Sequence, residues 1–396
     1  MTATPAPRLR IFTETRLHRR PDGSVVVVDR SSGAEAWEPY RRRLGQVDLA
    51  ARLSRSEAVD GVPVGPVAIH ALPSYRGVPQ LVRRLPRVLR AVLGATAAPD
   101  LCLFRLPGTI SLVGASWCRL RRRRYAVEVV GDPADVLRSG VLGPAGTWLA
   151  PAVAAATRWA VAGAAAGRYV TARTLQGRYP LAPGAAEYHY SNVRLAAEDL
   201  TTGPRPARAV RRLVAVGTHD QLYKGHDDLI RAAALLAVRG VPVALSLVGD
   251  GRHHDELRQL ARDCGVERLV TFHGRVNDRA ALRELLDAAD LFCMPSRTEG
   301  LPRALIEAMA RGLPAVGTTV GGIPELLPPP WLVPPSDPGA LAGLVGRFVD
   351  GSVDYAAASA QAWQRGQEFA PGPQAERVER WLAELDALAG LAIGST

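Results

Sequence analysis

Lysine is nearly absent from this 396-residue sequence: of its 49 lysine and arginine residues, one, Lys224, is a lysine. Cysteine is also scarce. The four cysteines form no CxxC pair, which argues against a zinc site or a disulfide framework and favours a reduced, cytoplasmic protein. No clean apolar run has the length of a membrane-spanning helix, because glycines and prolines interrupt the nearest candidate, residues 139–157. Residues 1–10 lack the apolar core of a secretory signal.

Aromatic residues make up 6% of the chain, and the net charge is +11. A basic protein can bind nucleic acid or an anionic membrane surface. So few aromatic side chains offer few stacking platforms for bases, which argues against a nucleic-acid partner. The abundance of Arg, Ala, Gly and Pro also indicates a GC-rich genome, and codon usage then explains much of the charge. The arginines at residues 119 and 121–124 are either the solvated end of a helix or a peripheral contact to the inner membrane face.

Short apolar or β-branched runs alternate with helix-length segments along the chain. We expect strands at residues 24–29, 67–72, 101–106, 126–130, 167–170, 213–217, 243–248, 269–273, 291–294 and 315–318. We expect helices at residues 81–93, 151–166, 225–238, 253–264, 279–288, 302–311 and 374–392. Such alternation predicts an α/β protein with two doubly wound, Rossmann-like domains that face each other across a cleft.

The alternation is interrupted once, at residues 201–212, where glycine, two prolines and four arginines indicate an exposed linker. The sequence therefore predicts an N-terminal domain at residues 1–205 and a C-terminal domain at residues 206–373. A terminal helix at residues 374–396 is expected to pack back on the first domain.

Three loops follow expected strands of the C-terminal domain, at the edge where ligands bind in such sheets. The first, residues 216–225, contains Gly217, Thr218 and Lys224 and opens a helix whose free N–H groups suit a phosphate. Lys224 is a compact cation for a diphosphate, and an exposed lysine without a role is the alternative. The second loop contains Gly249 and Asp250, and its glycines permit either a plain turn or the close approach of a ligand.

The third loop, residues 295–302, contains Glu299 and runs into a helix that carries Glu307, with Pro302 suited to the first helical position. The two glutamates are eight residues apart, about 12 Å along a helix. That spacing suits two carboxylates that accept hydrogen bonds from separate hydroxyl groups of one extended ligand. The alternative is a pair of ordinary surface glutamates.

These segments carry a family resemblance. The runs KGHDDLI (224–230), LVGDG (247–251), FHGRV (272–276) and AADLFCMPSRTEGLPRALIEAMARGLPAVGTTVGGIPE (288–325) resemble the donor-binding domain of glycosyltransferase family 4, whose members are retaining, nucleotide-sugar-dependent enzymes of the GT-B fold. The resemblance covers residues 213–333. In the first half, YAVEVVGDP (125–133) and SNV (191–193) are similar to a polysaccharide-type branch of the group.

The resemblance implies roles for individual residues. Glu307 would bind the ribose hydroxyls, and Glu299 the donor sugar beside the backbone of Gly300, Leu301 and Pro302. Lys224 would bind the diphosphate, together with Arg303 or His219, because many relatives place an arginine where this chain has Thr218 and His219. The nucleotide base would lie along Gly274, Arg275 and Val276. Asp132 would face the sugar from the first domain, where many relatives have a histidine.

The first domain would bind the acceptor. Residues 13–20 replace a glycine pair that is common in its first loop, and Thr15, His18 and Arg19 are the acceptor-side candidates. The resemblance implies front-face attack without a protein nucleophile, a metal or a cofactor. The acceptor is a secondary-metabolite aglycone or a lipid-linked or polysaccharide glycan, and the base and the sugar stay open.

Other functions fit less well. Asp132 and Asp135 read better as a helix start than as metal ligands. A nucleotide-sugar epimerase on the same scaffold would need an acid/base group in the cleft. A phosphorylase would need a second lysine, for pyridoxal phosphate. An arginine-rich binder of anionic surfaces is the remaining alternative.

Overall fold

The computed structural model describes residues 8–29, 32–56, 59–138 and 144–393, and these residues divide into two compact units. The first contains the described parts of residues 1–190 and 376–396, and the second contains residues 191–375. The boundary at 190/191 lies before the expected one at 205/206. None of the helices among the described residues has the length and apolar character needed to cross a bilayer.

The first unit has a nine-stranded sheet. Its strands are β1 (Leu9–Arg19), β2 (Val25–Val27), β3 (Val47–Arg55), β4 (Val62–Pro63), β5 (Ala68–Pro73), β6 (Leu101–Leu106), β7 (Tyr125–Val129), β8 (Ala166–Tyr169) and β9 (Ala186–His189). Strands β5, β3, β1, β6, β7, β8 and β9 pair in parallel in that order, and β2 and β4 are antiparallel additions beside β1.

Helices cover this sheet. They are α1 (Ala34–Leu44), α2 (Gly77–Ala95), α3 (Thr109–Leu120), α4 (Pro133–Val136), α5 (Pro144–Ala162) and α6 (Thr174–Arg178). The last helix of the chain, α14 (Pro371–Ile393), reaches back to this unit, where Trp381, Leu382 and Leu385 join its apolar core. The Trp381 indole donates a hydrogen bond to the buried Glu128 carboxylate at 3.1 Å. A terminal helix that packs on the first domain was therefore correctly expected.

The second unit is a six-stranded parallel sheet in the order β12-β11-β10-β13-β14-β15. Its strands are β10 (Arg212–Val216), β11 (Ala244–Val248), β12 (Val270–Gly274), β13 (Leu291–Met294), β14 (Ala315–Thr318) and β15 (Leu332–Val333). Its helices are α7 (His226–Val238), α8 (His254–Asp263), α9 (Arg279–Ala288), α10 (Arg303–Ala310), α11 (Ile323–Leu326), α12 (Pro338–Val349) and α13 (Tyr355–Gln367).

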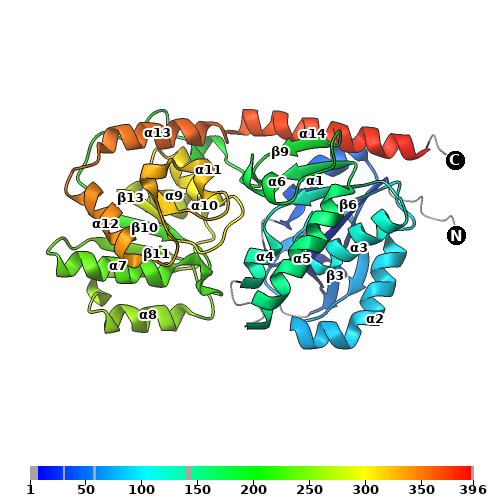
Figure 1. The fold of residues 1–396 in the computed structure, drawn as a ribbon, viewed down its shortest axis with the longest axis horizontal. Coiled ribbons are helices and arrows are strands. Elements are labelled where there is room, and N and C mark those ends of the chain that lie inside the picture. The colour runs from blue at the N-terminus through cyan, green and yellow to red at the C-terminus, as the bar shows by residue number, and fades with distance from the viewer. Residues whose placement is uncertain (1–7, 30–31, 57–58, 139–143, 394–396) are drawn as a thin grey trace. The chain divides into compact units, whose positions relative to one another are not determined.

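Two apolar clusters lie on the two faces of this second sheet. Leu213 and Ala215 of β10 pack with α7, α8 and α12, whereas Val214 packs with α9, α10 and α11 (Figure 1). Successive residues of a strand point to opposite faces, so a strand buried on both faces is apolar throughout. This arrangement is the doubly wound sheet that the sequence predicts.

The segment at residues 201–212, expected as an exposed linker, is exposed at seven of its twelve residues but belongs to the second unit, where Arg205 anchors it. The Arg205 guanidinium donates to the carbonyl oxygens of Leu286, Ala289 and Arg311 at 3.0, 2.8 and 2.9 Å. Its backbone N–H donates to the Ser359 hydroxyl at 2.7 Å. The composition correctly indicated exposure for most of the segment, but it gave no sign that Arg205 would bind three carbonyl groups at the ends of neighbouring elements.

Candidate functional site

Lys224 and Glu299 form an ion pair at the carboxyl ends of the second sheet. The Lys224 Nζ lies 2.7 Å from the Glu299 Oε1, and the Ser296 hydroxyl donates to the same oxygen at 2.7 Å. The two side chains are 19% and 8% exposed. Lys224 ends a short 3₁₀ turn before α7, and Glu299 lies in the loop between β13 and α10. The two residues that the sequence singles out for the reacting end of a donor are thus in direct contact.

Arg297 ties together the loops that carry this pair. Its guanidinium donates to the Leu222 carbonyl at 2.7 Å and to the Asp227 and Asp228 carboxylates at 2.7 and 2.6 Å. Its backbone N–H donates to the Tyr223 carbonyl at 2.7 Å. Sequence reasoning missed this arginine; the acidic pair at the start of α7 and an arginine two residues before Glu299 were the available signal.

A glycine loop supports Glu299 from the other side. Gly321 has a φ of +52°, and a Cβ there would lie 2.0 Å from the Glu299 carbonyl oxygen. The next residue, Gly322, donates its N–H to the Gly300 carbonyl at 2.7 Å. A side chain at Gly321 would collide with the Glu299 backbone, so a glycine is needed there, and the Gly322 hydrogen bond joins the two loops. This glycine loop therefore fixes the position of Glu299. Pro302 lies at the N-cap, one residue before the helical position expected for it, and Leu301 is half-buried.

Lys224 stays cationic despite its burial. Burial lowers the pKa of the ammonium, but the attraction of Glu299 more than compensates, and the net effect raises the pKa above its usual value. Arg303, the exposed first residue of α10, acts against this by repulsion. Arg303 also attracts Glu307, so the charge of Arg303 influences both Lys224 and Glu307.

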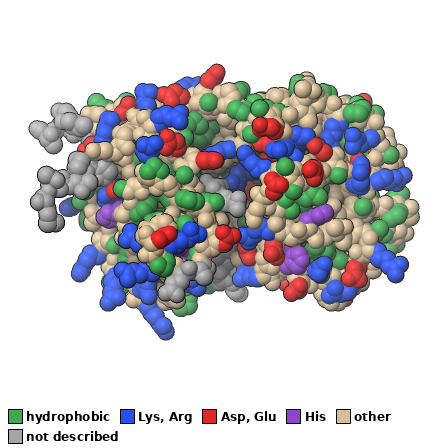
Figure 2. All heavy atoms as spheres, turned by 180° about the vertical axis from the view of Figure 1, so that it is seen from behind, with side chains coloured by type: hydrophobic (Ala, Val, Ile, Leu, Met, Phe, Trp, Pro, Cys, Tyr) green, Lys and Arg blue, Asp and Glu red, His purple; other side chains and the backbone are tan. Residues whose placement is uncertain are grey.

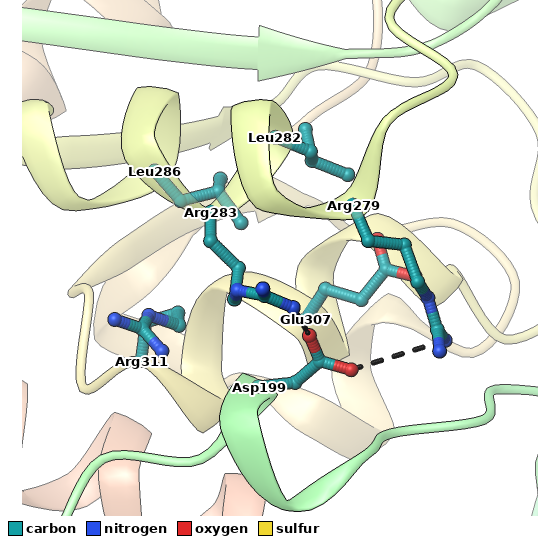
Figure 3. A pocket seen from close by; sticks show the side chains of 7 residues that line it. All are labelled: Asp199, Arg279, Leu282, Arg283, Leu286, Glu307 and Arg311. Atoms are coloured by element: carbon teal, nitrogen blue, oxygen red, sulfur yellow. Dashed lines mark hydrogen bonds and ion pairs between the residues drawn. The ribbon is translucent and has the colours of Figure 1, made fainter.

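Glu307 lies on α10 and lines a small pocket of about 60 Å³. The other lining residues are Asp199, Arg279, Leu282, Arg283, Leu286 and Arg311. Figure 3 shows Arg279, Arg283 and Glu307 converging near Asp199, whose carboxylate lies 3.0 Å from Arg283 and 3.8 Å from Arg279. Burial raises the pKa of Glu307, and Arg303 and Arg279 oppose that shift. Asp199, Arg279 and Arg283 were not predicted, because their meeting depends on contacts about 84 residues apart in sequence.

Three histidines lie beneath the first two loops. The His219 and His254 Nδ1 atoms are 3.1 Å apart, and the His219 ring meets the His226 ring edge-on at 4.9 Å between centroids. Burial lowers the pKa of His219 to about 4 and that of His226 to about 3. His219 is therefore neutral near pH 7 and brings no positive charge to a diphosphate.

The glycines of the second loop have a structural explanation. A Cβ on Gly249 would lie 1.8 Å from the Gly217 carbonyl oxygen, so the close approach is between the two loops themselves. Thr218 donates its hydroxyl to the Asp220 carboxylate at 3.0 Å, and the Asp250 carbonyl accepts the His219 N–H at 2.9 Å. These contacts hold the first two loops side by side.

The candidate base-binding segment begins at Gly274, the last residue of β12. The Gly274 carbonyl accepts the Gly249 N–H at 2.9 Å, which joins this segment to the second loop. Arg275 is exposed, and Val276 packs on the apolar cluster beneath α9 and α10.

Asp132 lies in the first unit as the N-cap of α4, which confirms the helix start expected there. Its Oδ1 accepts from the Ala134 N–H at 2.7 Å and from the Tyr179 hydroxyl at 2.6 Å, and its Oδ2 pairs with Arg178. Burial raises the pKa of Asp132, but Tyr179 and Arg178 more than offset this and lower it overall, so the carboxylate stays ionised. Among the described residues, no group of three or more His, Cys, Asp or Glu side chains is arranged to hold a metal.

The three acceptor-side candidates lie on β1, where the sequence suggested a loop. The Thr15 and Thr13 hydroxyls are 2.8 Å apart, His18 Nδ1 lies 3.1 Å from the Ser54 hydroxyl, and Arg19 is exposed. The charged residues of this segment concealed an 11-residue strand.

Comparison with known proteins gives consistent results. Residues 210–350 match the family described as "Glycosyl transferases group 1". Protein CapJ of Staphylococcus aureus is 27% identical over 285 residues, which are 72% of this chain and 71% of CapJ. Further curated relatives align over 26–41% of this chain and 28–41% of their own lengths.

Two solved structures resemble nearly the whole chain. Sucrose-phosphate synthase from Thermosynechococcus elongatus has a TM-score of 0.69 at 17% identity and covers 96% of this chain and 99% of its own. Anabaena Alr3699/HepE in complex with UDP has a TM-score of 0.58 at 18% identity and covers 98% and 99%. At such identities the likeness concerns the fold, which is GT-B with two Rossmann-like units.

Proposed function

The chain is a group 1 glycosyltransferase with the GT-B fold, and we propose that it transfers a hexosyl group from a nucleoside-diphosphate sugar to a hydroxyl or amine of an acceptor with retention of configuration. The observation that carries this proposal is the contact of Lys224 with Glu299 at the carboxyl edge of the second sheet. The solved relative HepE is described in complex with UDP and with UDP-glucose, which supports a nucleotide-sugar donor.

The ion pair has the chemistry to bind the reacting end of such a donor. Lys224 offers a cation to the diphosphate. Glu299 uses Oε1 for Lys224 and Ser296, and within the described residues no donor occupies its Oε2. That oxygen is therefore available to a hydroxyl group of the donor sugar, as a charged acceptor worth about 1.5–3 kcal/mol per hydrogen bond.

Glu307 would bind the ribose. Its carboxyl group forms no hydrogen bond within the described part of the chain, although it is largely buried in the pocket between α9 and α10. Leu282 and Leu286 give the pocket apolar walls, which suit the carbon face of a nucleoside. Gly274 at the end of β12, with Arg275 and Val276 after it, would line the base.

In the proposed reaction, the bond between the anomeric carbon and the phosphate oxygen breaks while the acceptor oxygen attacks from the same face. The leaving diphosphate takes the hydroxyl proton, so the step needs no protein nucleophile and, we propose, no metal or cofactor. Charge grows on the diphosphate, and Lys224 stabilises it where it develops. Asp132 would offer its ionised carboxylate to the donor sugar, and Arg178 and Tyr179 hold that carboxylate in place.

We favour a glycan or lipid-linked acceptor over a small aglycone. Relatives at 32–35% identity are named for colanic acid and amylovoran biosynthesis, and relatives at 36–41% are named as phosphatidylinositol mannoside mannosyltransferases. These names concern the relatives over partial alignments.

The test is product analysis by mass spectrometry over a panel of UDP-, GDP- and dTDP-sugars with glycan, glycolipid and aglycone acceptors. A glycosylated acceptor supports the proposal, whereas an isomerised donor without transfer would indicate the epimerase. Glu307→Gln is expected to raise the donor KM by about tenfold or more with a smaller change in kcat. Glu267→Gln, on the exposed surface of the same unit, is the matched control. An unchanged donor KM in Glu307→Gln would remove this residue from the site.

We propose that a peripheral membrane contact lies on α2, and not on the arginines at residues 119 and 121–124 that the sequence suggested for it. From Gly61 to Pro99 the chain has five arginines and no acidic residue. The C-terminal half of α2 has three buried apolar residues, Val88, Val92 and Ala95. The same apolar stripe continues toward the N-terminus of the helix, where Val78, Val82 and Leu85 are 42%, 62% and 38% exposed. On the opposite side of the helix lie the exposed residues Arg83, Arg84, Arg87 and Arg90. Figure 2 shows basic side chains crowded at the lower left edge, in the part occupied by the first unit.

A helix with an uncovered apolar stripe and arginines on its other side fits an anionic lipid surface, where the apolar side chains insert and the arginines are attracted to the phosphate groups. Flotation with phosphatidylglycerol vesicles tests this. We expect binding by the wild type, weaker binding at high salt, and loss of binding in Val82→Ser/Leu85→Ser. Val238→Ser, at an 87% exposed valine of the second unit, should bind like the wild type. Equal flotation of all three proteins, or none with wild type, would contradict the assignment.

A further inference from the structure

Strand β1 has an irregularity where three arginines gather. Its parallel pairing with β3 shifts between Phe12 and Arg16, which face Ala50 and Arg52, so β1 has two residues more than β3 at this point. Bulges re-aim side chains and often occur beside functional sites. Here the bulge places Glu14 and Arg16 beside Arg52 of β3 and the loop after β5.

The Arg16 and Arg52 guanidinium groups share one acceptor. Each donates to the Tyr75 carbonyl at 3.4 Å, and Arg52 also lies over the Tyr75 ring at 4.5 Å. Arg52 donates to the Glu14 carbonyl at 2.5 Å and lies 3.5 Å from its carboxylate. Within the described residues Arg16 forms no ion pair, and the buried Nε atoms of both arginines have no hydrogen-bond partner.

Glu14 offsets one positive charge of this group, because its single carboxylate lies 3.5 Å from Arg52. Its Oε1 accepts the Ile110 N–H at 2.5 Å at the start of α3, and its Oε2 accepts the Tyr75 hydroxyl at 3.2 Å. Burial and Glu14 raise the pKa of Tyr75 to about 12, so this hydroxyl stays a donor. Among the described residues Glu14 pairs with Arg52 alone, which leaves the charges of Arg16 and of the nearby, exposed Arg76 without a carboxylate partner.

The neighbouring ionisable groups respond to this excess charge. Burial lowers the pKa of Arg16, and Arg52 and Arg76 lower it further. Burial likewise lowers the pKa of His18, with Arg16 and Arg76 adding to the shift.

We propose that Arg16 and Arg52, with Arg76 at the edge, bind a phosphoryl group of the acceptor. The inference rests on the proposed function and names the acceptor class: a phosphorylated sugar or a lipid-linked phosphate. A phosphate monoester or diphosphate carries about two negative charges, which matches the excess of two, whereas a carboxylate carries one. Guanidinium groups match phosphate oxygens through paired N–H donors.

The location supports this assignment. These residues lie toward the carboxyl ends of parallel strands, where ligands bind in such sheets. Thr15, His18 and Arg19, the acceptor-side candidates, lie on the same strand. Arg76 is also the N-cap of α2, so a lipid phosphate at this site would lie next to the helix proposed to contact the membrane.

The test is calorimetric binding to the full-length protein in a Lys224→Gln background, which removes the expected phosphate contact of the donor site. The probes are glucose 6-phosphate, dodecyl phosphate and glucuronate. We expect at least one phosphate probe to bind, and Arg16→Gln and Arg52→Gln each to weaken it by about tenfold or more. Arg42→Gln, which removes an 80% exposed charge from α1, should bind within about twofold of the background protein. Preference for one phosphate probe identifies the sugar or the lipid as its source.

Two measurements keep the inference separate from the proposed function. Nucleotide protection in thermal unfolding with UDP and GDP, in proteins with native Lys224, reports the donor site and should not change in Arg16→Gln. Absence of nucleotide binding by the wild type would refute the proposed function alone. Arg16→Lys retains the positive charge but lacks the paired N–H donors, so it should bind phosphate more weakly than arginine and more tightly than glutamine at this position. This variant tests the site even if Arg16→Gln does not fold. Phosphate binding that persists in Arg52→Gln and Arg16→Lys, no phosphate binding at all, or equal binding of glucuronate would overturn the inference.

Discussion

Breaking the Lys224–Glu299 pair should destabilise the second unit by an amount that the structure allows us to bracket. At 2.7 Å and an effective dielectric constant of about 20, the attraction between two unit charges is about 6 kcal/mol before desolvation. Loss of one partner of a fully buried pair costs about 3–5 kcal/mol, and an exposed pair contributes about 0–1 kcal/mol. Because Glu299 is 8% and Lys224 19% exposed, we expect Glu299→Gln and Lys224→Met each to cost about 2–3 kcal/mol.

The double variant separates the pair from its surroundings. Lys224→Met/Glu299→Gln removes both charges, so no unpaired charge is left buried. Its loss in the free energy of unfolding should therefore be smaller than the two single-variant losses added together, by a coupling of about 2 kcal/mol. Urea unfolding of the four proteins measures this coupling. The matched control is the exposed pair Arg262–Glu267, at 45% and 62% exposure, whose cycle should give less than about 0.5 kcal/mol. Additive losses at 224 and 299 would refute the reasoning.

The pH dependence of the coupling follows from the sign of the shift. Because the folded pKa of Lys224 lies above its usual value of 10.5, the stability from the pair is fully present below the unfolded pKa. It is lost as the pH rises through the folded pKa. The coupling should therefore be the same at pH 7 and pH 9, and a decline across that range would contradict a charged lysine.

Three further changes have defined outcomes. The pKa of His226 is about 3 in the folded protein and 6.5 in the unfolded chain. Its contribution to stability is therefore present above pH 6.5 and falls by about 1.4 kcal/mol per pH unit as the pH drops toward 3. Urea unfolding at pH 5 and 7 should show that His226→Gln removes this part of the pH dependence. Gly321→Ala meets the Glu299 carbonyl at 2.0 Å and should cost about 1–3 kcal/mol more than Gly351→Ala and lower kcat. Gly351 also has a positive φ but has open space around it, so equal thermal stability and kcat of the two variants would exclude the steric effect. Trp381→Phe removes the hydrogen bond to buried Glu128 and should lower the free energy of unfolding by about 1.5–3 kcal/mol; a loss no larger than that of Trp363→Phe, whose indole donates to the Thr201 carbonyl, would count against a charge-assisted bond.

The second unit was predictable because its strands are buried on both faces. Residues such as Leu213, Val214 and Ala215 form continuous apolar runs, and α9 begins and ends at the expected residues. The helices α12 and α13 were not predicted, since glycine and alanine dilute their apolar pattern.

The first unit was less predictable because it buries charges inside its sheet. Arg10 of β1 forms two hydrogen bonds with Asp48 of β3, at 2.7 and 2.6 Å. Such residues read as exposed in a sequence, and only their pairing across neighbouring strands makes their burial possible.

The site shows the same division. Lys224, Glu299 and Glu307 were identified because each lies in a short segment with its own pattern. Arg297 and Asp199 act through partners about 70 and 84 residues away, and a local pattern contains no information on such contacts.

The buried cations of this protein provide a common argument for both proposed sites. Arg10, Arg168 and Lys224 each have a carboxylate within about 3 Å, as desolvated charges require. Half-buried Arg16 has no such carboxylate within the described residues, because Glu14 pairs with the neighbouring Arg52. Lys224 carries its counter-ion in the free protein, so a donor diphosphate must share the ammonium with Glu299. At Arg16 and Arg52 a bound anion would compensate charge that the chain leaves unmatched, and affinity for phosphate should therefore depend more steeply on salt at this site than at Lys224.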